Sequence, residues 1–413
     1  MRMETSNPKA GALRQIELQI EKLVYGGAGL ARCDGKVFFV DEVLPGERIL
    51  AEVVEEKKDF GRGRVVKILE ASPDRTMAPC PYFGQCGGCQ WQHIPKALQN
   101  QSRVDILSEL LARQKIESAP SIRFLEGPPF GYRNRQRFHR LADGSLGMFR
   151  LHSQDGIRID ACPLMNEPMN EVLARLQTEL PGEPYDAVTL FSDAQRVLAA
   201  FEFEGEPGKI VQLLPPDGAG QVETKLQFEL ASYRFKAAVT GFFQVNSVVA
   251  EAMLQQMEAW IGGIAQRSVA LDLYAGAGLF TLPLARHFAL VVAVEENADA
   301  VEAGRLNISA NDASHAQYFC ASVEAWLRQE GGRYRHPDLL CVDPPRDGLG
   351  RFVVERIVQL APRYLVYVSC NPSTLARDLR SLAAHYQLED VVIADLFPQT
   401  YHIETMVLLG VRG

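Results

Sequence analysis

Three short motifs in the last third of the chain each follow an apolar run that could form a strand. The motifs are Ala275-Gly-Ala-Gly278 after Val269–Leu273, Asp343-Pro-Pro-Arg346 after Leu339–Val342, and Cys370-Asn-Pro372 after Tyr364–Val368. Helical patterns separate the runs, which predicts a mainly parallel sheet covered by helices. Because such sheets bind ligands at the carboxyl ends of their strands, the three motifs are predicted to line one crevice.

The glycine motif has the composition of a loop that passes close to a nucleoside. Gly276 and Gly278 let the backbone approach a ligand at a helix start. Glu295 ends the next strand, where its carboxylate could hold both hydroxyls of a ribose. A two-glycine loop is shared with NAD-binding proteins. Thr281 stands where the dinucleotide fingerprint has a third glycine, and the loop as a whole resembles the S-adenosylmethionine loop of class I methyltransferases.

Cys370 is the candidate nucleophile of this crevice. It lies between a predicted strand and a predicted helix that Ser373 or Thr374 could cap. Only the thiolate is a strong nucleophile, and the partial positive charge of a helix N-terminus is expected to lower the pKa of Cys370. An isolated cysteine is more often a buried structural residue, whereas the neighbouring Asn-Pro and the crevice favour catalysis.

The remaining seven cysteines are unevenly spaced. Cys80, Cys86 and Cys89 fall within ten residues, and the others are dispersed. A disulfide framework is not expected in a long cytosolic chain. The close cysteines therefore predict a metal or cluster site, and their spacing leaves zinc and iron–sulfur open.

The elements before this crevice differ in type from those that form it. Residues 14–71 read as short strands divided by glycine and proline turns, which predicts a small β-barrel. A helical pattern covers Lys96–Gln114, and residues 122–240 return to strand-like segments. A domain boundary is therefore expected near residues 235–245.

The chain has 413 residues and a net charge of −8, which predicts two or three domains of an ordinary globular protein. No apolar run approaches the roughly 20 residues of a membrane span. No signal peptide is recognisable, so we expect a cytoplasmic protein without a membrane partner. A monomer is the default expectation. Four arginines and no acid lie between Tyr132 and Arg140, which is typical of a nucleic-acid surface or of a solvated strand.

Together these residues resemble the RNA uracil-5-methyltransferase family, in particular its ribosomal RNA enzymes. The matching motifs are FFQVN (242–246), DLYAGAG (272–278), DPPRDG (343–348), SCNP (369–372) and HIETM (402–406). The resemblance implies a multidomain fold. Its parts are an N-terminal OB-like β-barrel of the TRAM type (14–72), a central α+β domain with an iron–sulfur cluster (73–241) and a C-terminal α/β class I, Rossmann-like methyltransferase (242–413).

The same resemblance implies a role for individual residues. Cys370 would be the nucleophile and Glu404 the base that removes a proton. The positions that match the S-adenosylmethionine site are Gln244, Tyr274, Gly276, Gly278, Leu279, Glu295, Ser322 and Asp343. The implied ligands of a [4Fe-4S] cluster, with zinc as the alternative, are Cys80, Cys86, Cys89 and Cys162. The residues expected to contact RNA phosphates and bases are Arg133, Arg135, Arg137 and Phe138.

A thiolate and a base suit methylation at carbon 5 of uracil. That carbon is a poor nucleophile until a thiolate adds at carbon 6, and the proton at carbon 5 must leave afterwards. Together with this chemistry, the resemblance implies methylation of a uridine in 23S ribosomal RNA. The alternatives are a uridine in the transfer-RNA T-loop, an RNA cytosine-5-methyltransferase and a non-catalytic iron–sulfur protein that binds RNA.

Overall fold

The computed structural model describes residues 14–116, 120–179, 185–214 and 224–412. The chain forms two compact units. The first contains the N-terminal residues to Gly84, Cys89–Ser102 and Gln399–Tyr401, and the second contains the rest. The expectation about a signal peptide concerns residues 1–13, which lie outside the described residues. In the part of the chain that is described, no helix is long and apolar enough to cross a membrane.

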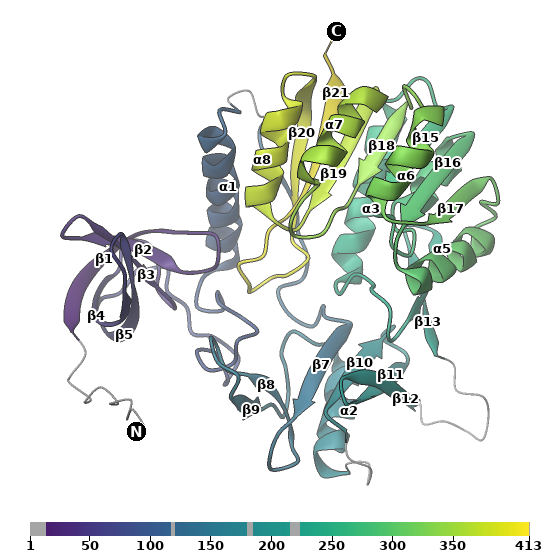
Figure 1. The fold of residues 1–413 in the computed structure, drawn as a ribbon. Helices are drawn as coiled ribbons and strands as arrows, with labels where there is room; N and C mark the ends of the chain where they lie inside the picture. Colours follow the sequence, from purple (N-terminus) through teal and green to yellow (C-terminus); the bar gives the residue numbers. More distant parts are fainter. Residues whose placement is uncertain (1–13, 117–119, 180–184, 215–223, 413) are drawn as a thin grey trace, which may run out of the picture. The chain divides into compact units, whose positions relative to one another are not determined.

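The first unit contains a closed five-stranded barrel (Figure 1). Its strands are β1 (Gln15–Leu23), β2 (Gly29–Cys33), β3 (Lys36–Val40), β4 (Arg48–Glu56) and β5 (Phe60–Glu70). Alternate residues point inward and form a core that includes Leu18, Phe38 and Ile49. Gly61 is required beside this core, because a Cβ there would lie 2.5 Å from the Phe38 ring. The predicted β-barrel is confirmed.

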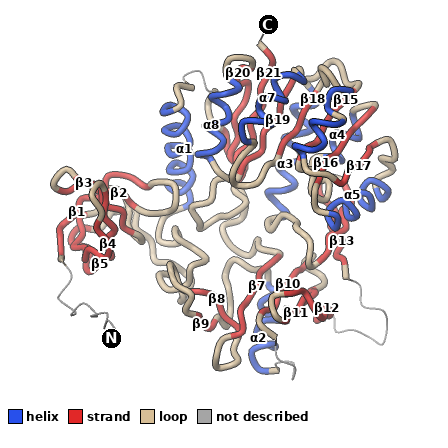
Figure 2. Tube along the Cα trace, in the orientation of Figure 1, coloured by secondary structure: helices blue, strands red, loops and turns tan. Residues whose placement is uncertain are grey.

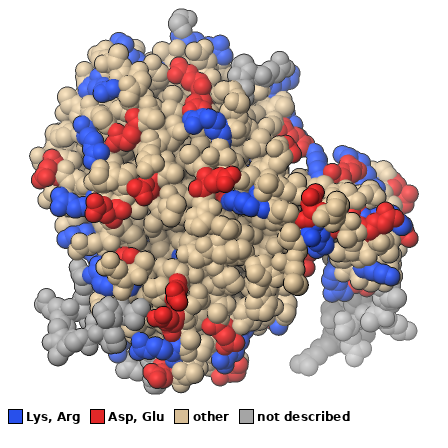
Figure 3. Space-filling view, turned by 180° about the vertical axis from the view of Figure 1, so that it is seen from behind, with Lys and Arg blue, Asp and Glu red and all other residues tan. Residues whose placement is uncertain are grey.

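Charged side chains pair across neighbouring strands of this barrel. Arg48 contacts Glu17 at 2.9 Å and Glu70 at 2.7 Å, and Arg64 contacts Glu52. Lysine and arginine are interspersed with aspartate and glutamate on the face of the molecule shown in Figure 3. Arg62 and Arg64 of β5 pair with Glu55 and Glu52 of β4, so these basic residues lie among acidic ones.

The second unit contains an eight-stranded sheet in the order β17-β16-β15-β18-β19-β21-β20-β6. Its strands are β15 (Val269–Leu273), β16 (Leu290–Glu295), β17 (Ala316–Cys320), β18 (Leu339–Val342), β19 (Tyr364–Ser369), β20 (Tyr386–Ala394), β21 (Glu404–Val411) and β6 (Arg123–Leu125). The first five strands are parallel, and β21 runs antiparallel to both of its neighbours. This is the class I methyltransferase arrangement, so the predicted C-terminal fold is confirmed.

Helices cover both faces of this sheet, as Figure 2 shows. They are α3 (Ser247–Gly262), α4 (Thr281–His287), α5 (Ala298–Ala310), α6 (Val323–Gln329), α7 (Gly350–Leu360) and α8 (Pro372–Leu382). Helices α6, α7 and α8 lie side by side on one face, and α3 and α4 pack together on the other (Figure 1). Buried residues of α3, the sheet and the segments Lys225–Leu230 and Tyr233–Ala238 share one hydrophobic core.

A second sheet in this unit has the order β12-β11-β10-β7-β8-β9 and is accompanied by α2 (Glu167–Thr178). Its strands are β7 (Arg135–Arg140), β8 (Leu146–Phe149), β9 (Gly156–Arg158), β10 (Ala187–Ser192), β11 (Val197–Phe203) and β12 (Glu206–Leu214). A separate hairpin, β13 (Lys225–Leu230) and β14 (Tyr233–Ala238), precedes the segment 240–244.

One element crosses the expected boundary between the central and catalytic domains. β6 pairs in parallel with β20 at the edge of the eight-stranded sheet, although it comes from the region predicted to be central. Arg123 of β6 is held there by Asp390 and Gln256. Helix α1 (Lys96–Arg113) also reaches this region, since Arg103 donates to the carbonyl oxygens of Phe397 and His402.

Candidate active site

A cavity of about 680 Å³ lies at the carboxyl ends of β15, β16 and β18. Most of its wall comes from four segments that are distant in sequence: 240–244, 274–280, 295–300 and 343–350. Phe235, Val323 and Glu324 complete the wall. Its size is in the usual range for a site that binds a small molecule. Of the predicted cofactor-site residues, those that line it are Gln244, Tyr274, Gly276, Leu279, Glu295 and Asp343.

The backbone of the glycine loop has an unusual conformation. Tyr274, Gly276 and Gly278 have φ values of 63°, 53° and 92°. A Cβ at Gly278 would lie 2.9 Å from the hydroxyl of Tyr318, so glycine is required there by both backbone and space. Tyr274 adopts the left-handed region without being glycine, and strain of this kind is concentrated at functional sites.

The carboxylate of Glu295 is fixed at the edge of the cavity by two backbone groups. Its Oε2 accepts a hydrogen bond of 2.9 Å from Gly276 N–H, and its Oε1 accepts one of 2.8 Å from Asn297 N–H. Asn297 also caps α5, because its side chain accepts from Ala300 N–H. The position suits the predicted contact with ribose hydroxyls, and that role stays a prediction.

The loops after β18 and β19 are tied together beside Cys370. Asn371 Nδ2 donates to the carbonyl oxygen of Arg346 at 3.0 Å, and Thr374 Oγ1 donates to the same oxygen at 3.1 Å. The Asn371 Oδ1 atom accepts from Ser373 N–H and caps α8. Asn371, not Ser373 or Thr374, is therefore the cap of this helix. An asparagine directly before proline at a helix start is the sequence signal that could have identified it.

The expectation of a lowered Cys370 pKa is wrong. Burial, together with the negative charges of Glu404 and Asp343, raises the pKa of Cys370 to about 11, and Arg346 offsets this only in part. Desolvation of the thiolate and two nearby carboxyls thus outweigh the helix N-terminus. Cys370 is half-buried and is not among the residues that line the cavity.

Glu404 and Asp343 form the acidic part of this site. Burial and the charge of Asp343 raise the pKa of Glu404 well above its usual range, while Arg346 lowers it. Burial and Glu295 raise the pKa of Asp343 to about 7. Glu404 is the first residue of β21, and only 7% of it is exposed. The tertiary structure thus places a thiol, two carboxyls and one guanidinium within electrostatic reach of one another.

Ser322 has a different local role from the one expected. Its side chain accepts a hydrogen bond of 3.3 Å from Ala325 N–H and caps α6, and it does not line the cavity. The two following residues, Val323 and Glu324, do line it. The predicted contact of Ser322 with a cofactor stays untested.

Comparison with known proteins identifies the family. A family model described as tRNA (Uracil-5-)-methyltransferase matches residues 218–412. The 23S rRNA (uracil(1939)-C(5))-methyltransferase RlmD of Pseudomonas putida is 34% identical, over 97% of this chain and 95% of that protein. RlmD of Pectobacterium atrosepticum is 33% identical, over 97% and 94%. The chain belongs to the RNA uracil-5-methyltransferase family.

This uracil-5-methyltransferase also shares its fold with a solved structure. The tRNA (uracil-54, C5)-methyltransferase of Pyrococcus abyssi, in complex with S-adenosyl-L-homocysteine, superimposes with a TM-score of 0.75. The match covers 95% of this chain and all of the other at 24% identity, so it concerns the fold. The family assignment makes this protein an S-adenosylmethionine-dependent RNA (uracil-5-)-methyltransferase.

The structure changes the interpretation of the arginine-rich strand of this methyltransferase. Phe138 is 0% exposed, so it belongs to the core and has no free face for a base. Arg135 donates to the carbonyl oxygens of Val239 and Gly241, and its guanidinium lies 4.9 Å from the centre of the Phe191 ring. Strand periodicity explains why Phe138 is buried, because alternate residues point to opposite faces and Phe138 faces away from Arg135 and Arg137.

Of the other two arginines, only Arg137 is exposed. Arg137 pairs with Glu202 at 2.6 Å on the sheet surface. Arg133 is half-buried, and its charge acts on His402 together with Arg346 and Arg103. These charges and, above all, burial lower the pKa of His402 to about 4, so its ring is neutral at physiological pH.

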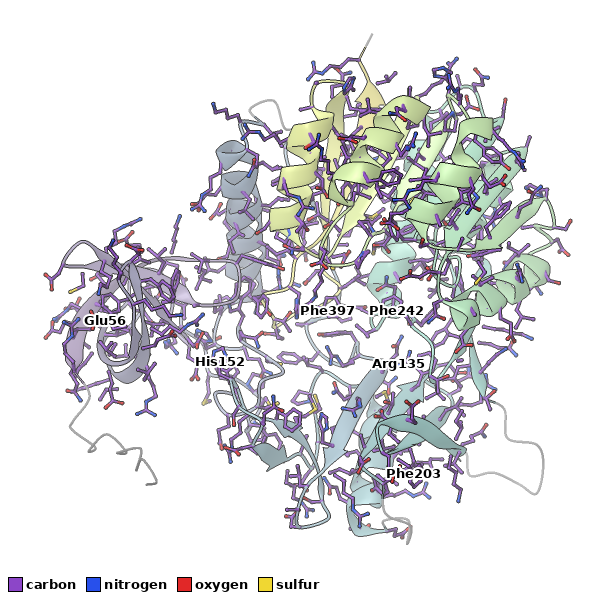
Figure 4. All side chains as sticks on the ribbon, in the orientation of Figure 1. Glu56, Arg135, His152, Phe203, Phe242 and Phe397 are labelled. Atoms are coloured by element: carbon purple, nitrogen blue, oxygen red, sulfur yellow. The ribbon has the colours of Figure 1, made fainter. Side chains whose placement is uncertain are left out.

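Phe242 is an exposed aromatic residue that the sequence did not single out. Its side chain is 73% exposed, and it lines both the cavity and an adjoining groove of about 470 Å³ that also contains Arg133 and Arg137. Figure 4 shows Phe242 close to Arg135, between the eight-stranded sheet and the second sheet. Its position within the FFQVN motif was the available signal.

The four predicted cluster ligands are divided between the two compact units. Cys80 and Cys89 belong to the first unit, and Cys86 and Cys162 belong to the second. All four are half-buried. Gly88 N–H donates to the Cys86 sulfur at 3.4 Å, a contact that stabilises a thiolate. Within the described ranges, no three His, Cys, Asp or Glu side chains are grouped to hold a metal ion, so the cluster stays a prediction.

Proposed function

We propose that this enzyme methylates carbon 5 of a uridine in 23S ribosomal RNA through a covalent bond between Cys370 and carbon 6 of the base. The observation that carries this proposal is the grouping of Cys370, Glu404, Asp343 and Arg346, which influence one another's ionisation. A thiol, a carboxyl base and a guanidinium are the groups that addition and elimination at a uracil ring require.

Cys370 acts first in the proposed reaction. Its thiol loses a proton, and the thiolate sulfur forms a bond to carbon 6 of uracil. The electron pair of the carbon 5–carbon 6 double bond passes to an enolate, whose negative charge the Arg346 guanidinium can stabilise. Bound S-adenosylmethionine would supply the methyl group that carbon 5 takes, and the broken sulfur–methyl bond would leave the neutral thioether S-adenosylhomocysteine.

Glu404 completes the reaction by removing the proton from carbon 5. The electron pair of that carbon–hydrogen bond restores the double bond, and the bond between carbon 6 and sulfur breaks to regenerate the Cys370 thiolate. Burial and Asp343 raise the pKa of Glu404, so its carboxylate is a stronger base than an exposed glutamate. Atoms and charge balance with one methyl group transferred and one proton released.

The choice of 23S ribosomal RNA rests on relatives of nearly the same length. The RlmD proteins of P. putida and P. atrosepticum are named for 23S rRNA and align with 97% of this chain. A transfer RNA is the second candidate, because the family model and the P. abyssi structure carry transfer-RNA names. The covalent chemistry would be the same on either RNA.

Phe242 marks the proposed path of the RNA. An exposed ring at the mouth of the cavity can stack on a base next to the target, and the groove that it shares with Arg133 can follow the phosphate backbone. The target base must leave its own stack to reach the buried carboxyls, so we expect it to be flipped out or taken from a loop.

We also propose that Cys80, Cys86, Cys89 and Cys162 hold a [4Fe-4S] cluster. Their support is the donor set, since four half-buried thiols suit iron–sulfur or zinc, and the backbone N–H that faces the Cys86 sulfur. All four sites of such a cluster would be occupied by protein ligands. We therefore assign it no step in methyl transfer and expect a structural role.

The direct test is transfer of a radiolabelled methyl group from S-adenosylmethionine to size-separated RNA from cells that lack the enzyme. Label in 5-methyluridine of 23S RNA supports the proposal, and label in transfer RNA supports the second candidate. Cys370→Ala is the control, and it should bind S-adenosylhomocysteine normally but transfer no methyl group. Appreciable turnover by Cys370→Ala would rule out the covalent route, and no label with any RNA would favour a non-catalytic RNA-binding protein.

A further inference from the structure

Two asparagines of α5 pair with the outer edge of the β13–β14 hairpin. Asn307 Oδ1 accepts from Lys236 N–H at 2.7 Å, and Asn311 Oδ1 accepts from Arg234 N–H at 2.9 Å. In return, the two Nδ2 groups donate to the carbonyl oxygens of Lys236 and Arg234. Four residues along a helix and two residues along a strand both span about 6 Å, so the two asparagines match the spacing of Arg234 and Lys236. Each carboxamide bonds to the N–H and the carbonyl oxygen of one strand residue, as a residue of a neighbouring strand would.

Asn307 makes one further hydrogen bond that Asn311 does not make. Its Nδ2 donates to the carbonyl oxygen of Ala277 at 2.9 Å, and the whole residue is 0% exposed. Ala277 lies between Gly276 and Gly278 and lines the cavity. A fully buried amide of α5 with partners in β14 and in the glycine loop holds these three elements at defined distances.

The neighbouring carbonyl of the glycine loop is held in a similar way. The Tyr318 hydroxyl donates to the Gly276 carbonyl oxygen at 3.3 Å and contacts Thr281 Oγ1 at 3.2 Å. Thr281 in turn donates to the buried Asp272 at 2.5 Å. Neither Asn307 nor Tyr318 lines the cavity. Two successive loop carbonyls are therefore fixed by side chains that a bound cofactor would not touch.

The hairpin clamped by Asn307 leads directly into another wall of the same cavity. β14 ends at Ala238, and the segment 240–244 that follows it lines the cavity together with Phe235 of β14. One carboxamide thus joins the strand that precedes this wall to the glycine loop. A side chain of another length at this position, or one without these hydrogen bonds, would alter the distance between the segment 240–244 and the glycine loop.

We propose that Asn307 is a positioning residue for S-adenosylmethionine, which it would not contact. Its carboxamide sets the glycine loop relative to the hairpin and thereby the shape of the cofactor cavity. Asn311 clamps the same hairpin without reaching the loop. The proposal rests on the methyl donor of the family and is independent of the covalent step at Cys370 and of the identity of the RNA.

The test is calorimetric binding of S-adenosylhomocysteine to the full-length protein and to the variants Asn307→Ala and Asn311→Ala. Loss of a buried hydrogen bond at the loop should weaken binding by Asn307→Ala about tenfold. Asn311→Ala loses two bonds to the hairpin and one to the backbone carbonyl of Asn307, but none to the loop, and its Kd should stay within about twofold of the parent. In methyl transfer, Asn307→Ala should raise the KM for S-adenosylmethionine far more than it lowers kcat at saturation.

A purely structural role predicts a different result. Asn307→Ala would then lower the melting temperature and the fraction of active protein while the Kd of the folded fraction stayed unchanged, and this would overturn the proposal. Equal weakening by both variants would also overturn it, because the hairpin clamp alone would explain the effect. If Asn307→Ala is insoluble, Asn307→Ser is measured in the same way with the same criteria. The binding and melting measurements require no RNA, so they remain valid if the proposed substrate is wrong.

Discussion

Asn371 Nδ2 lies 3.0 Å from the carbonyl oxygen of Arg346 and joins the loop of the nucleophile to the loop of Asp343. The same asparagine caps α8 through its Oδ1 atom. One side chain thus positions Cys370 relative to both the helix that follows it and the neighbouring strand end. The two loops meet because β18 and β19 are adjacent and parallel.

Replacing Asn371 should affect catalysis more than stability. Asn371→Ala removes a helix cap, which costs about 1 kcal/mol of unfolding free energy. It also removes one of the two side-chain hydrogen bonds to the Arg346 carbonyl, so kcat should fall at least about tenfold with little change in the KM for S-adenosylmethionine. Thr374→Val is the matched control, because it removes the second bond to the same carbonyl and keeps the cap. An Asn371→Ala variant as active as the parent would show that the hydrogen bond from Asn371 to the Arg346 carbonyl does not contribute to catalysis.

The Glu404→Gln variant should accumulate the covalent complex with RNA. The amide cannot accept the carbon 5 proton, so the bond between Cys370 and carbon 6 forms but does not break. The complex should appear as a slowly migrating band on a denaturing gel after incubation with RNA and S-adenosylmethionine. The double variant Glu404→Gln/Cys370→Ala should give no band, and a band that persists in it would contradict the assignment of the nucleophile.

The rate of methyl transfer should rise with pH through the neutral range. Cys370 and Glu404 must lose protons to act, and both pKa values are raised, so their reactive forms increase as pH increases. Arg346 lowers both values, and Arg346→Gln should therefore slow the reaction at neutral pH and move the rise to higher pH. Single-turnover rates between about pH 6 and 9.5 measure this.

The matched control for Arg346 is an arginine on the outer surface of the same unit. Arg351→Gln removes a charge that is 93% exposed and paired with Glu355, and that charge does not contribute to the pKa shifts of Cys370 and Glu404. Its profile should coincide with that of the parent enzyme. If the pH–rate profile of Arg346→Gln also coincides with that of the parent enzyme, the Arg346 guanidinium does not lower the pKa of the Cys370 thiol.

Phe242→Ala should weaken RNA binding without a comparable effect on the cofactor. Loss of one stacked base costs about 1–3 kcal/mol of binding free energy. Phe242→Tyr keeps the ring and should bind RNA nearly as well as the parent. Fluorescence anisotropy with an RNA fragment and calorimetry with S-adenosylhomocysteine separate the two effects. If Phe242→Ala loses S-adenosylhomocysteine and retains RNA, the residue belongs to the cofactor cavity alone.

Anaerobically purified protein should contain iron and acid-labile sulfide in equal amounts, about four of each per chain. Cys86→Ser should lower the iron content, because it removes one of the four proposed ligands. Cys320→Ser, which changes an exposed cysteine outside the set, should not. Zinc in place of iron and sulfide would show that the iron–sulfur proposal is wrong and that the four thiols form a zinc site.

The sequence by itself was sufficient for the barrel, the parallel sheet and the family. The reason is local: periodic apolar runs define strands, and motifs such as DPPR and SCNP lie at strand ends, whose location a parallel sheet fixes. The strand limits Val269–Leu273 and Leu339–Val342 agree with β15 and β18. Local patterns did not indicate that Arg123–Leu125 would join a sheet that begins 146 residues later, with β15 at Val269.

Only the tertiary structure decided the pKa of the candidate nucleophile, the burial of individual aromatic residues and the contacts that each side chain makes. The local pattern predicts an acidic thiol at Cys370, whereas burial and two carboxyls from other strands make it a weak acid. Phe138 and Phe242 are both aromatic residues near basic ones, yet one is buried and the other 73% exposed. Asn307 reads as an ordinary helix residue until β14 and the glycine loop are brought beside it. Burial and long-range contacts depend on the packing of distant segments, and that packing has no local signature.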